Sequence, residues 1–250
     1  MSGAPVPRAA RWSAFLRSFT IQGSWNYHTM MGGGFAFALL PVLRRLRRDR
    51  QELEKALARH VEHFNTHPYL SGIALGAVAR LEADGSDPAL VGRFKVAIKG
   101  PLGGLGDNLV WAAWLPTTML LGLVLWAVGA PPWVAVVVFL ALYNVGHLGL
   151  RLWGFDVGLR EGTEVAGRLR EAALGRHAER IIRVGCVALG LLSGELLVRM
   201  GGLGGLPGFW SALAGAAFVL GLLAGLRAWR PAALAVVGAV AGITLVGWVA

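Results

Sequence analysis

The sequence predicts an all-α integral membrane protein, and three observations lead to that prediction. Hydrophobic residues make up 55% of the 250 residues and charged residues only 15%, whereas soluble domains average about 25% charged residues. No charged residue occurs from Leu109 to Leu150, a stretch too long for one membrane span of about 20 residues. Most of the basic residues stand between apolar stretches, as is typical of the loops of a membrane protein.

The charge distribution also predicts sidedness. Although the net charge is +10, the basic residues do not form one groove, so we expect no nucleic-acid partner. Loops rich in Lys and Arg stay on the cytoplasmic side, so we place the charged segments there. These segments are Met1–Thr20, Arg44–His60, Arg80–Lys99, Arg151–Arg183 and Arg227–Arg230.

The first hundred residues predict short or interfacial elements. Ile21–Leu43 carries no formal charge but contains amides, a histidine and three consecutive glycines, so we expect a re-entrant or interfacial element. Arg44–His60 is rich in good helix formers and predicts a charged helix. Tyr69–Ala79 is an apolar run of about half a membrane thickness. Such half-helices are typical of inverted-repeat-like transporter subunits, whose sites use broken helices.

The apolar block that begins at Leu109 predicts a helical hairpin, because Pro131 and Pro132 interrupt it near the middle. Three further spans are expected downstream, at Val184–Val198, Leu203–Leu226 and Pro231–Ala250. We therefore divide the chain into residues 1–162, with the re-entrant segments and the hairpin 109–150, and residues 163–250, a cytoplasmic helix followed by transmembrane helices.

A polar, glycine-rich segment stands just before the apolar block. Gly100–Asn108 reads as a glycine-rich turn that ends in Asp107 and Asn108. Polar groups at the edge of a membrane are kept where they are buried in protein or line a cavity, which indicates a solute pathway. The alternative is structural, with Asp107 as the N-cap of a helix that begins at Leu109.

Two other polar groups are candidates for solute contact. Asn65, Thr66 and His67 precede Pro68, which disfavours helical backbone at His67, and they could equally cap a helix terminus. Asn144 and His147 lie one helical turn apart near the end of the apolar block.

Three histidines suggest one further possibility, a metal site. His60, His63 and His67 would share one helix face, but Pro68 weakens that face and no HExxH motif occurs. No Ser/His/Asp order or pair of catalytic carboxylates is present either. We therefore expect no metal, no cofactor and no catalytic chemistry.

Four segments of the chain carry a family resemblance: Arg17–Leu40 (RSFTIQGSWNYHTMMGGGFAFALL), His60–Tyr69 (HVEHFNTHPY), Lys95–Pro116 (KVAIKGPLGGLGDNLVWAAWLP) and Tyr143–Gly162 (YNVGHLGLRLWGFDVGLREG). In this order they match the blocks QxSxNYExMQxxGFAxxxxP, HxxFFNTHP, KxGLMGPLAGIGDxxFWGTxRP and FNxxHxxxRxxGxxxGYxxG. Through these blocks the chain resembles the IID subunit of the mannose/fructose/sorbose family of the bacterial sugar phosphotransferase system. The chain departs from the family at His28, usually Glu, at Lys99, usually Met, and at Leu115, usually Arg. Lys99 would add a cation beside Asp107.

The resemblance implies a non-catalytic, multi-pass subunit of the bacterial cytoplasmic (inner) membrane that forms a sugar path with a IIC subunit. Cytoplasmic IIAB, or IIA and IIB, components would phosphorylate a hexose-type sugar, and IIC–IID pairs would form a higher oligomer. The expected sugar contacts are Asn65, Thr66, His67, Lys99, Asp107, Asn108, Asn144 and His147.

Two alternatives stay open at this point. The departures at Lys99 and Leu115 and the short C-terminal part would also suit an orphan regulatory or scaffold membrane protein that keeps the IID fold without transport. The three histidines are the only motive for a metal-dependent membrane enzyme.

Overall fold

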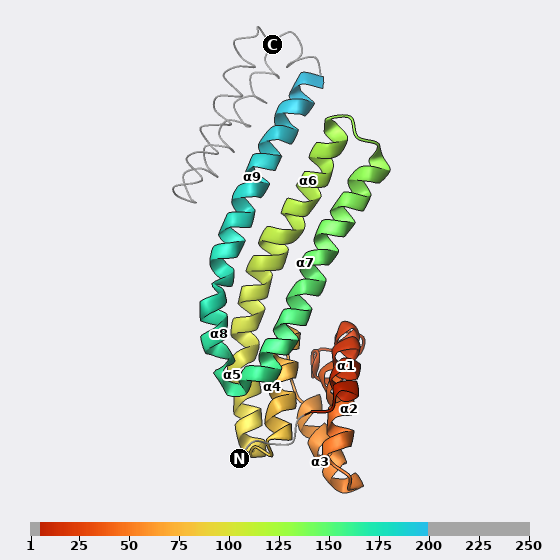
Figure 1. Cartoon of the computed structure of the whole chain (residues 1–250), viewed down its shortest axis with the longest axis vertical. Helices are drawn as coiled ribbons and strands as arrows, with labels where there is room; N and C mark the ends of the chain where they lie inside the picture. The colour runs from red at the N-terminus through yellow and green to blue at the C-terminus, as the bar shows by residue number, and fades with distance from the viewer. Residues whose placement is uncertain (1–5, 200–250) are drawn as a thin grey trace. The chain divides into compact units, whose positions relative to one another are not determined.

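The computed structural model describes residues 6–199, and in this range it consists of helices and loops without β-strands (Figure 1). The all-α prediction is therefore confirmed. The described chain divides into two compact units. The first contains residues 6–111 and 144–177, and the second contains residues 112–143 and 178–199.

The first unit begins with short helices. Helix α1 (Arg8–Arg17) continues into a 3₁₀ turn, η1 (Ser18–Thr20), and an exposed loop then leads to α2 (Gly32–Leu46). The predicted element Ile21–Leu43 is thus a loop followed by most of a helix. The predicted charged helix appears as α3 (Arg50–Val61), whose N-cap Asp49 accepts a hydrogen bond from the Glu52 N–H.

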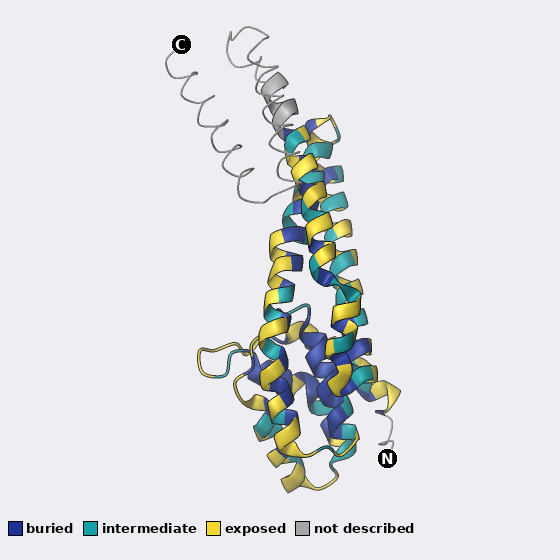
Figure 2. Cartoon of the chain, turned by 90° about the vertical axis from the view of Figure 1, so that its left-hand side faces the viewer, coloured by how far each residue is buried: buried dark blue, intermediate teal, exposed yellow. Residues whose placement is uncertain are grey.

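Helix α4 (Ser71–Ala83) is the centre of this unit. All residues from Ser71 to Ala79 are buried (Figure 2), so this small-residue run finds its protein neighbours within its own chain. Its glycines Gly72 and Gly76 pack against the backbone of the helix that carries Gly154 and Gly158, where a Cβ on either side would meet backbone atoms. Paired small-xxx-small spacings permit this close approach of two helices.

The glycine-rich segment is helical, which corrects the expected turn. Helix α5 (Pro88–Gly106) continues through a π-helical stretch, η2 (Asp107–Trp114), into α6 (Leu115–Ala127). Asp107 has helical dihedral angles of −60° and −43° and stands inside this continuous run, so it is not the N-cap of a helix beginning at Leu109. The expected break at Asp107 and Asn108 is replaced by a wider helical turn, a feature often found at functional sites.

In the second unit, the chain reverses between α6 and α7 (Pro132–Glu161) at the predicted proline pair. A Cβ on Gly122 would lie 3.0 Å from the Ala135 carbonyl oxygen, so the two arms of the hairpin pack closely. The Thr117 hydroxyl donates to the Ile181 carbonyl oxygen at 3.2 Å and joins this hairpin to α9 (Leu174–Arg199).

Between α7 and α9 lie a 3₁₀ turn, η3 (Gly162–Glu164), and α8 (Val165–Ala172). Two helical stretches, Pro88–Ala127 and Pro132–Leu192, each made of several consecutive elements, are long and apolar enough to cross a membrane by length and composition. The expected span Val184–Val198 falls within α9. The expected spans Leu203–Leu226 and Pro231–Ala250 lie outside the described residues.

Candidate functional site

The candidate site is built around the loop that follows α3. Phe64 is fully buried against the Phe35 ring, with ring centroids 4.6 Å apart. Its carbonyl oxygen accepts from the Met31 N–H at 2.8 Å, and its own N–H donates to the Thr29 carbonyl oxygen at 3.2 Å. These backbone bonds fix the loop before Asn65, Thr66 and His67, so the position of that tripeptide is well defined.

The loop lies directly on α5 because glycines remove the side chains between them. Gly103 approaches Thr66, and a Cβ on Gly106 would overlap the His67 side chain. Neither glycine has a positive φ, so their function here is close approach and not a turn. The polar loop and the start of the π-helical stretch, which the sequence places about forty residues apart, therefore meet at Gly106.

His67 presents an unused hydrogen-bond donor. The side chain is 2% exposed, and its Nδ1 accepts a hydrogen bond from the Tyr69 N–H at 3.2 Å. Burial lowers the pKa of His67 to about 4, with Asp107 opposing this shift, so the ring is neutral at pH 7. Because Nδ1 accepts, the proton is on Nε2, and Nε2 has no partner within the described structure.

The other two polar side chains of this loop differ in burial. The Thr66 hydroxyl is likewise buried without a hydrogen-bond partner among the described residues, whereas Asn65 is exposed. The Nδ1 bond of His67 supports the turn into α4, so the capping and solute-contact interpretations both remain open for His67. Buried polar atoms without partners are costly, which marks Thr66 and His67 as places where an external group would be favourable.

An aromatic and cationic cluster lies beside His67. The His67 ring centroid is 5.2 Å from that of Tyr69 and 5.3 Å from that of Trp111. Tyr69 stacks on His147 at 3.8 Å, and the Nε2 of His147 accepts from the Arg151 Nε at 2.7 Å. The structure therefore connects two predicted residues, His67 and His147, through Tyr69.

Arg151 was not predicted as a site residue. Its side chain is 4% exposed, and one terminal nitrogen donates to the Ser18 carbonyl oxygen at 3.0 Å. The guanidinium lies 4.7 Å from the Phe19 ring centroid and 5.2 Å from that of Tyr69, without a carboxylate partner among the described residues. Its sequence signal was present, since Arg151 is the first charge after the apolar block and fills the arginine of the fourth family block.

The remaining predicted residues lie at the surface of the unit. Asp107, Asn108 and Asn144 are exposed, and Asp107 directly follows Gly106 in the chain. Lys99 does not stand beside Asp107, which corrects that expectation. The two residues are eight apart on a helix, about 12 Å along its axis, and the Lys99 Nζ lies 3.2 Å from the Nδ1 of His63.

The three histidines do not share a helix face, because α3 ends at Val61. His60 is buried on α3, His63 is exposed beyond its end, and His67 packs on α5. Among residues 6–199 no three His, Cys, Asp or Glu side chains form a group suited to a metal ion. The expected three-histidine face is therefore wrong, for the physical reason that the helix stops six residues too early.

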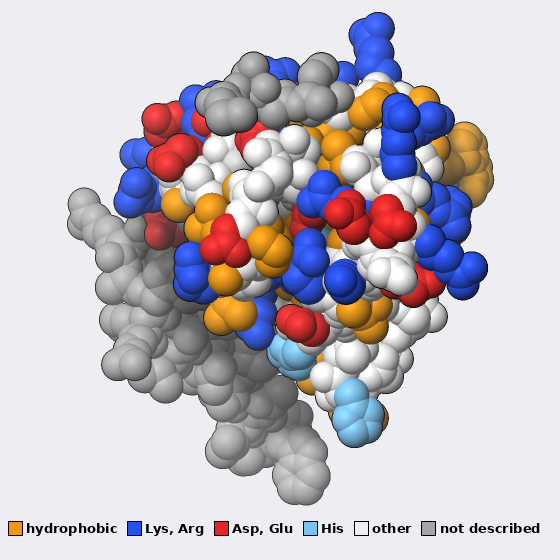
Figure 3. Space-filling model, turned by 90° about the horizontal axis from the view of Figure 1, so that it is seen from below, with side chains coloured by type: hydrophobic (Ala, Val, Ile, Leu, Met, Phe, Trp, Pro, Cys, Tyr) orange, Lys and Arg blue, Asp and Glu red, His pale blue; other side chains and the backbone are white. Residues whose placement is uncertain are grey.

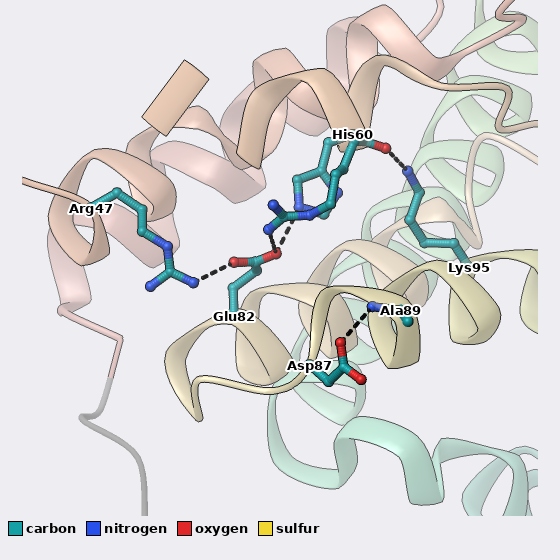
Figure 4. Close-up of polar contacts among 7 residues, drawn as sticks. Arg47, His60, Glu82, Asp87, Ala89 and Lys95 are labelled. Carbon is teal, nitrogen blue, oxygen red and sulfur yellow. Dashed lines mark hydrogen bonds and ion pairs between the residues drawn. The ribbon is translucent and has the colours of Figure 1, made fainter. Parts of the chain in front are cut away.

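A second polar cluster, the Glu82 network, joins three helices (Figure 4). The carboxylate of Glu82, 2% exposed on α4, accepts from Arg47 at 2.9 Å, Arg59 at 3.0 Å and His60 at 3.1 Å. Burial alone would raise the pKa of Glu82, but the hydrogen bonds from His60 and Arg59 and the positive charge of Arg59 lower it to about 2.

The partner groups of Glu82 are arranged for structure and not for metal binding. Burial lowers the pKa of His60, so its neutral ring donates through Nε2, while Nδ1 is buried without a partner in the described part of the chain. The amine of Lys95 donates to the Arg59 carbonyl oxygen at 3.0 Å and ties α5 to the same place. This network therefore fixes α2, α3, α4 and α5 below the candidate site.

Comparison with known proteins gives a consistent result. A family model described as the PTS system mannose/fructose/sorbose family IID component matches residues 6–200. The mannose-specific EIID component of Escherichia coli K12 is 33% identical over 184 residues, which cover 71% of this chain and 64% of that protein. The sorbose-specific EIID component of Klebsiella pneumoniae is 31% identical, with 72% and 67% covered. The matched part of the chain thus spans just under two thirds of the E. coli relative's length.

Two chains of solved structures are also similar to this chain. A chain in the cryo-EM structure of the mannose transporter ManYZ in complex with microcin E492 is 28% identical, with a TM-score of 0.59 over 76% of this chain and 70% of that chain. A second chain, from a structure described only as a membrane protein, is 30% identical with a TM-score of 0.68.

Proposed function

Because this chain belongs to the IID component family of the mannose/fructose/sorbose phosphotransferase systems, we propose that it is a non-catalytic membrane subunit of a sugar permease. The observation that carries the proposal is the family match over residues 6–200, which includes all four sequence blocks. The chain would form the sugar path together with a IIC subunit and lie, as a multi-pass protein, in a bacterial cytoplasmic membrane.

The side chains of the candidate site suit sugar binding and not phosphoryl transfer. The candidate site offers hydrogen-bond donors and acceptors, but no nucleophile paired with a base. Phosphoryl transfer would therefore take place on cytoplasmic IIAB, or IIA and IIB, components, which trap the arriving sugar as its phosphate. IIC–IID pairs would assemble into a higher oligomer.

The His67 region supports a hexose-type sugar as the transported solute. A sugar carries only hydroxyl donors and acceptors, so a site shielded from water must match each of them. The neutral His67 Nε2–H and the Thr66 hydroxyl have no partner among residues 6–199, and the exposed carboxylate of Asp107 and the amides of Asn65, Asn108 and Asn144 would add acceptors and donors.

Sugar binding by the purified IIC–IID pair tests this proposal. His67→Phe keeps an aromatic ring against Tyr69 and Trp111 but removes the Nε2–H donor, together with the Nδ1 acceptor of the Tyr69 N–H. We expect it to weaken hexose binding about tenfold, the value of one lost hydrogen bond, with the pair still intact. The matched control is His63→Phe at the exposed position nearby, which should bind normally. Equal binding by both variants, with intact pairs, would exclude His67 as a sugar contact.

A further inference from the structure

Helix α1 exposes an apolar stripe. Trp12 is 58% exposed, Leu16 63% and Phe19, in the following turn η1, 39%. These positions are four and three residues apart, so the three side chains share one face. The opposite face, with Ala10 and Ala14, is buried against the unit. An apolar stripe beside arginines is typical of a helix that lies in the membrane interface.

A cavity of about 240 Å³ lies between α1 and α7, within the first unit. Helix α1 contributes the cations Arg8 and Arg11 to its wall. Helix α7 contributes the apolar side chains Leu152, Phe155 and Leu159, and the acidic Asp156. The cavity thus combines a cationic wall with an apolar wall, which is the chemical pattern of an amphipathic ligand.

The position of the cavity along α7 corresponds to the edge of a membrane. Helix α7 begins at Pro132 and has no charged residue before Arg151. About 20 helical residues, each rising about 1.5 Å, cross the hydrocarbon core of a bilayer. Counting from Pro132, this length ends near Leu152, where the cavity starts, so the cavity lies at the depth of the lipid headgroups.

The charges of the cavity favour an anion. Neither Arg8 nor Arg11 forms an ion pair with any of the described residues. Asp156 is already paired with Arg160 at 2.7 Å. Lys and Arg side chains are also frequent on the described face seen from below in Figure 3, with Asp and Glu side chains among them.

We propose that this cavity binds one anionic phospholipid. The guanidinium groups of Arg8 and Arg11 hold the phosphate through charge-assisted hydrogen bonds. The acyl chains follow Leu152, Phe155 and the exposed stripe of α1 into the hydrocarbon. This lipid site requires only that the chain is a membrane protein, and it is separate from the proposed sugar site around His67.

Native mass spectrometry of the full-length protein in detergent tests the lipid site, with added dioleoyl phosphatidylglycerol or dioleoyl phosphatidylcholine. The double variant Arg8→Ala/Arg11→Ala should retain about tenfold less phosphatidylglycerol, because each basic residue near an anionic lipid contributes several-fold to affinity. The control Arg44→Ala/Arg45→Ala removes two exposed arginines from the last turn of α2 and should retain as much as the wild type.

A gain-of-binding variant makes the test independent of folding. Asp156→Asn removes the one acidic side chain from the cavity wall, so it should raise the retention of phosphatidylglycerol but not of phosphatidylcholine, a selective gain that misfolding does not produce. Unchanged retention in this variant, or in the double arginine variant, would overturn the proposal. Equal retention of phosphatidylcholine would also overturn it, as would displacement of the lipid by millimolar inorganic phosphate.

Discussion

His67 illustrates how one side chain combines a structural and a functional property. Its Nδ1 supports the backbone at Tyr69, and this fixes the tautomer whose Nε2–H has no acceptor among the residues that the structure describes. The lowered pKa keeps the ring neutral, so it can donate to a hydroxyl without adding a charge to a poorly hydrated place. Sequence reasoning identified His67 as polar and close to a helix break, but the tautomer depends on a contact that only the fold supplies.

At the residue scale, the contact between Gly106 and His67 can be tested by substitution. Gly106→Ala places a Cβ in the space of the His67 side chain, so we expect a loss of about 1–3 kcal/mol of stability from overpacking. Gly104→Ala is the matched control, because a Cβ there meets nothing within 4 Å and alanine favours the helix. Thermal unfolding of both variants in detergent checks this. A Gly106→Ala midpoint as high as that of Gly104→Ala would contradict the packing described.

Asp107 gives a second residue-scale prediction. Since Asp107 is not a helix N-cap, Asp107→Asn should not affect folding. Any change in sugar uptake then measures the contribution of the charged carboxylate. We expect uptake by the assembled permease to fall about tenfold or more, the value of a charged hydrogen bond of about 1.5–3 kcal/mol. Glu54→Gln, an exposed acid on α3, is the control. Normal uptake with normal expression of Asp107→Asn would exclude a sugar contact at this carboxylate.

At the scale of elements, the Glu82 network holds α2, α3 and α4 together. Glu82→Gln leaves Arg47 and Arg59, both only partly exposed, without their counter-charge. We expect the free energy of unfolding to fall by about 2–4 kcal/mol, which is less than the largest losses seen when a fully buried ion pair is broken. The control Asp84→Asn breaks the more exposed pair with Arg80 and should cost less than about 1 kcal/mol. Similar thermal midpoints for the two variants would show that the network does not stabilise the unit.

The same network has a defined pH dependence. The pKa of Glu82 is lowered from its ordinary value of 4.5 to about 2, so its stabilisation is complete above about pH 4.5 and is lost as the pH falls toward 2. The difference in thermal midpoint between wild type and Glu82→Gln should therefore be constant from pH 7.5 to 5.5 and shrink below pH 4.5. A difference that already shrinks near pH 6 would assign the titration to another group.

The elements that were predictable are those with strong local signals. The proline pair ends one helix and begins another, and good helix formers behind Asp49 give α3. The glycine-rich segment was misjudged because glycine permits two uses, a turn or a close helix contact, and only the position of His67 decides between them. The end of α3 at Val61 was also missed, since nothing in the local sequence marks it before Pro68.

At the scale of the whole molecule, composition was sufficient for the membrane class, and four sequence blocks were sufficient for the family. The cluster of Tyr69, His147 and Arg151 could not be predicted, because it joins residues about eighty positions apart through the glycine crossing of α4 and α7. Long-range contacts of this kind depend on the packing of complete helices and leave only weak traces in a single sequence.

The sidedness of the C-terminal part remains a prediction from charge. The residues beyond 199 lie outside the described structure, and their sequence predicts that the Arg227–Arg230 turn is cytoplasmic and Ala250 external. Single cysteines introduced beside Arg230 and at Ala250, in a Cys186→Ser background, should be labelled by an impermeant maleimide only at Ala250 in intact cells. External labelling beside Arg230 would reverse the orientation.

Phosphoenolpyruvate-dependent uptake of radiolabelled hexoses tests the central claim most directly. The measurement uses cells that lack their own mannose-family permease and express this chain with its cognate IIC, IIA and IIB components. We predict uptake only when both membrane subunits are present, with loss when either is omitted. Uptake that persists at the same rate without this chain would contradict its place in the sugar path and would indicate a regulatory or scaffold protein with the IID fold.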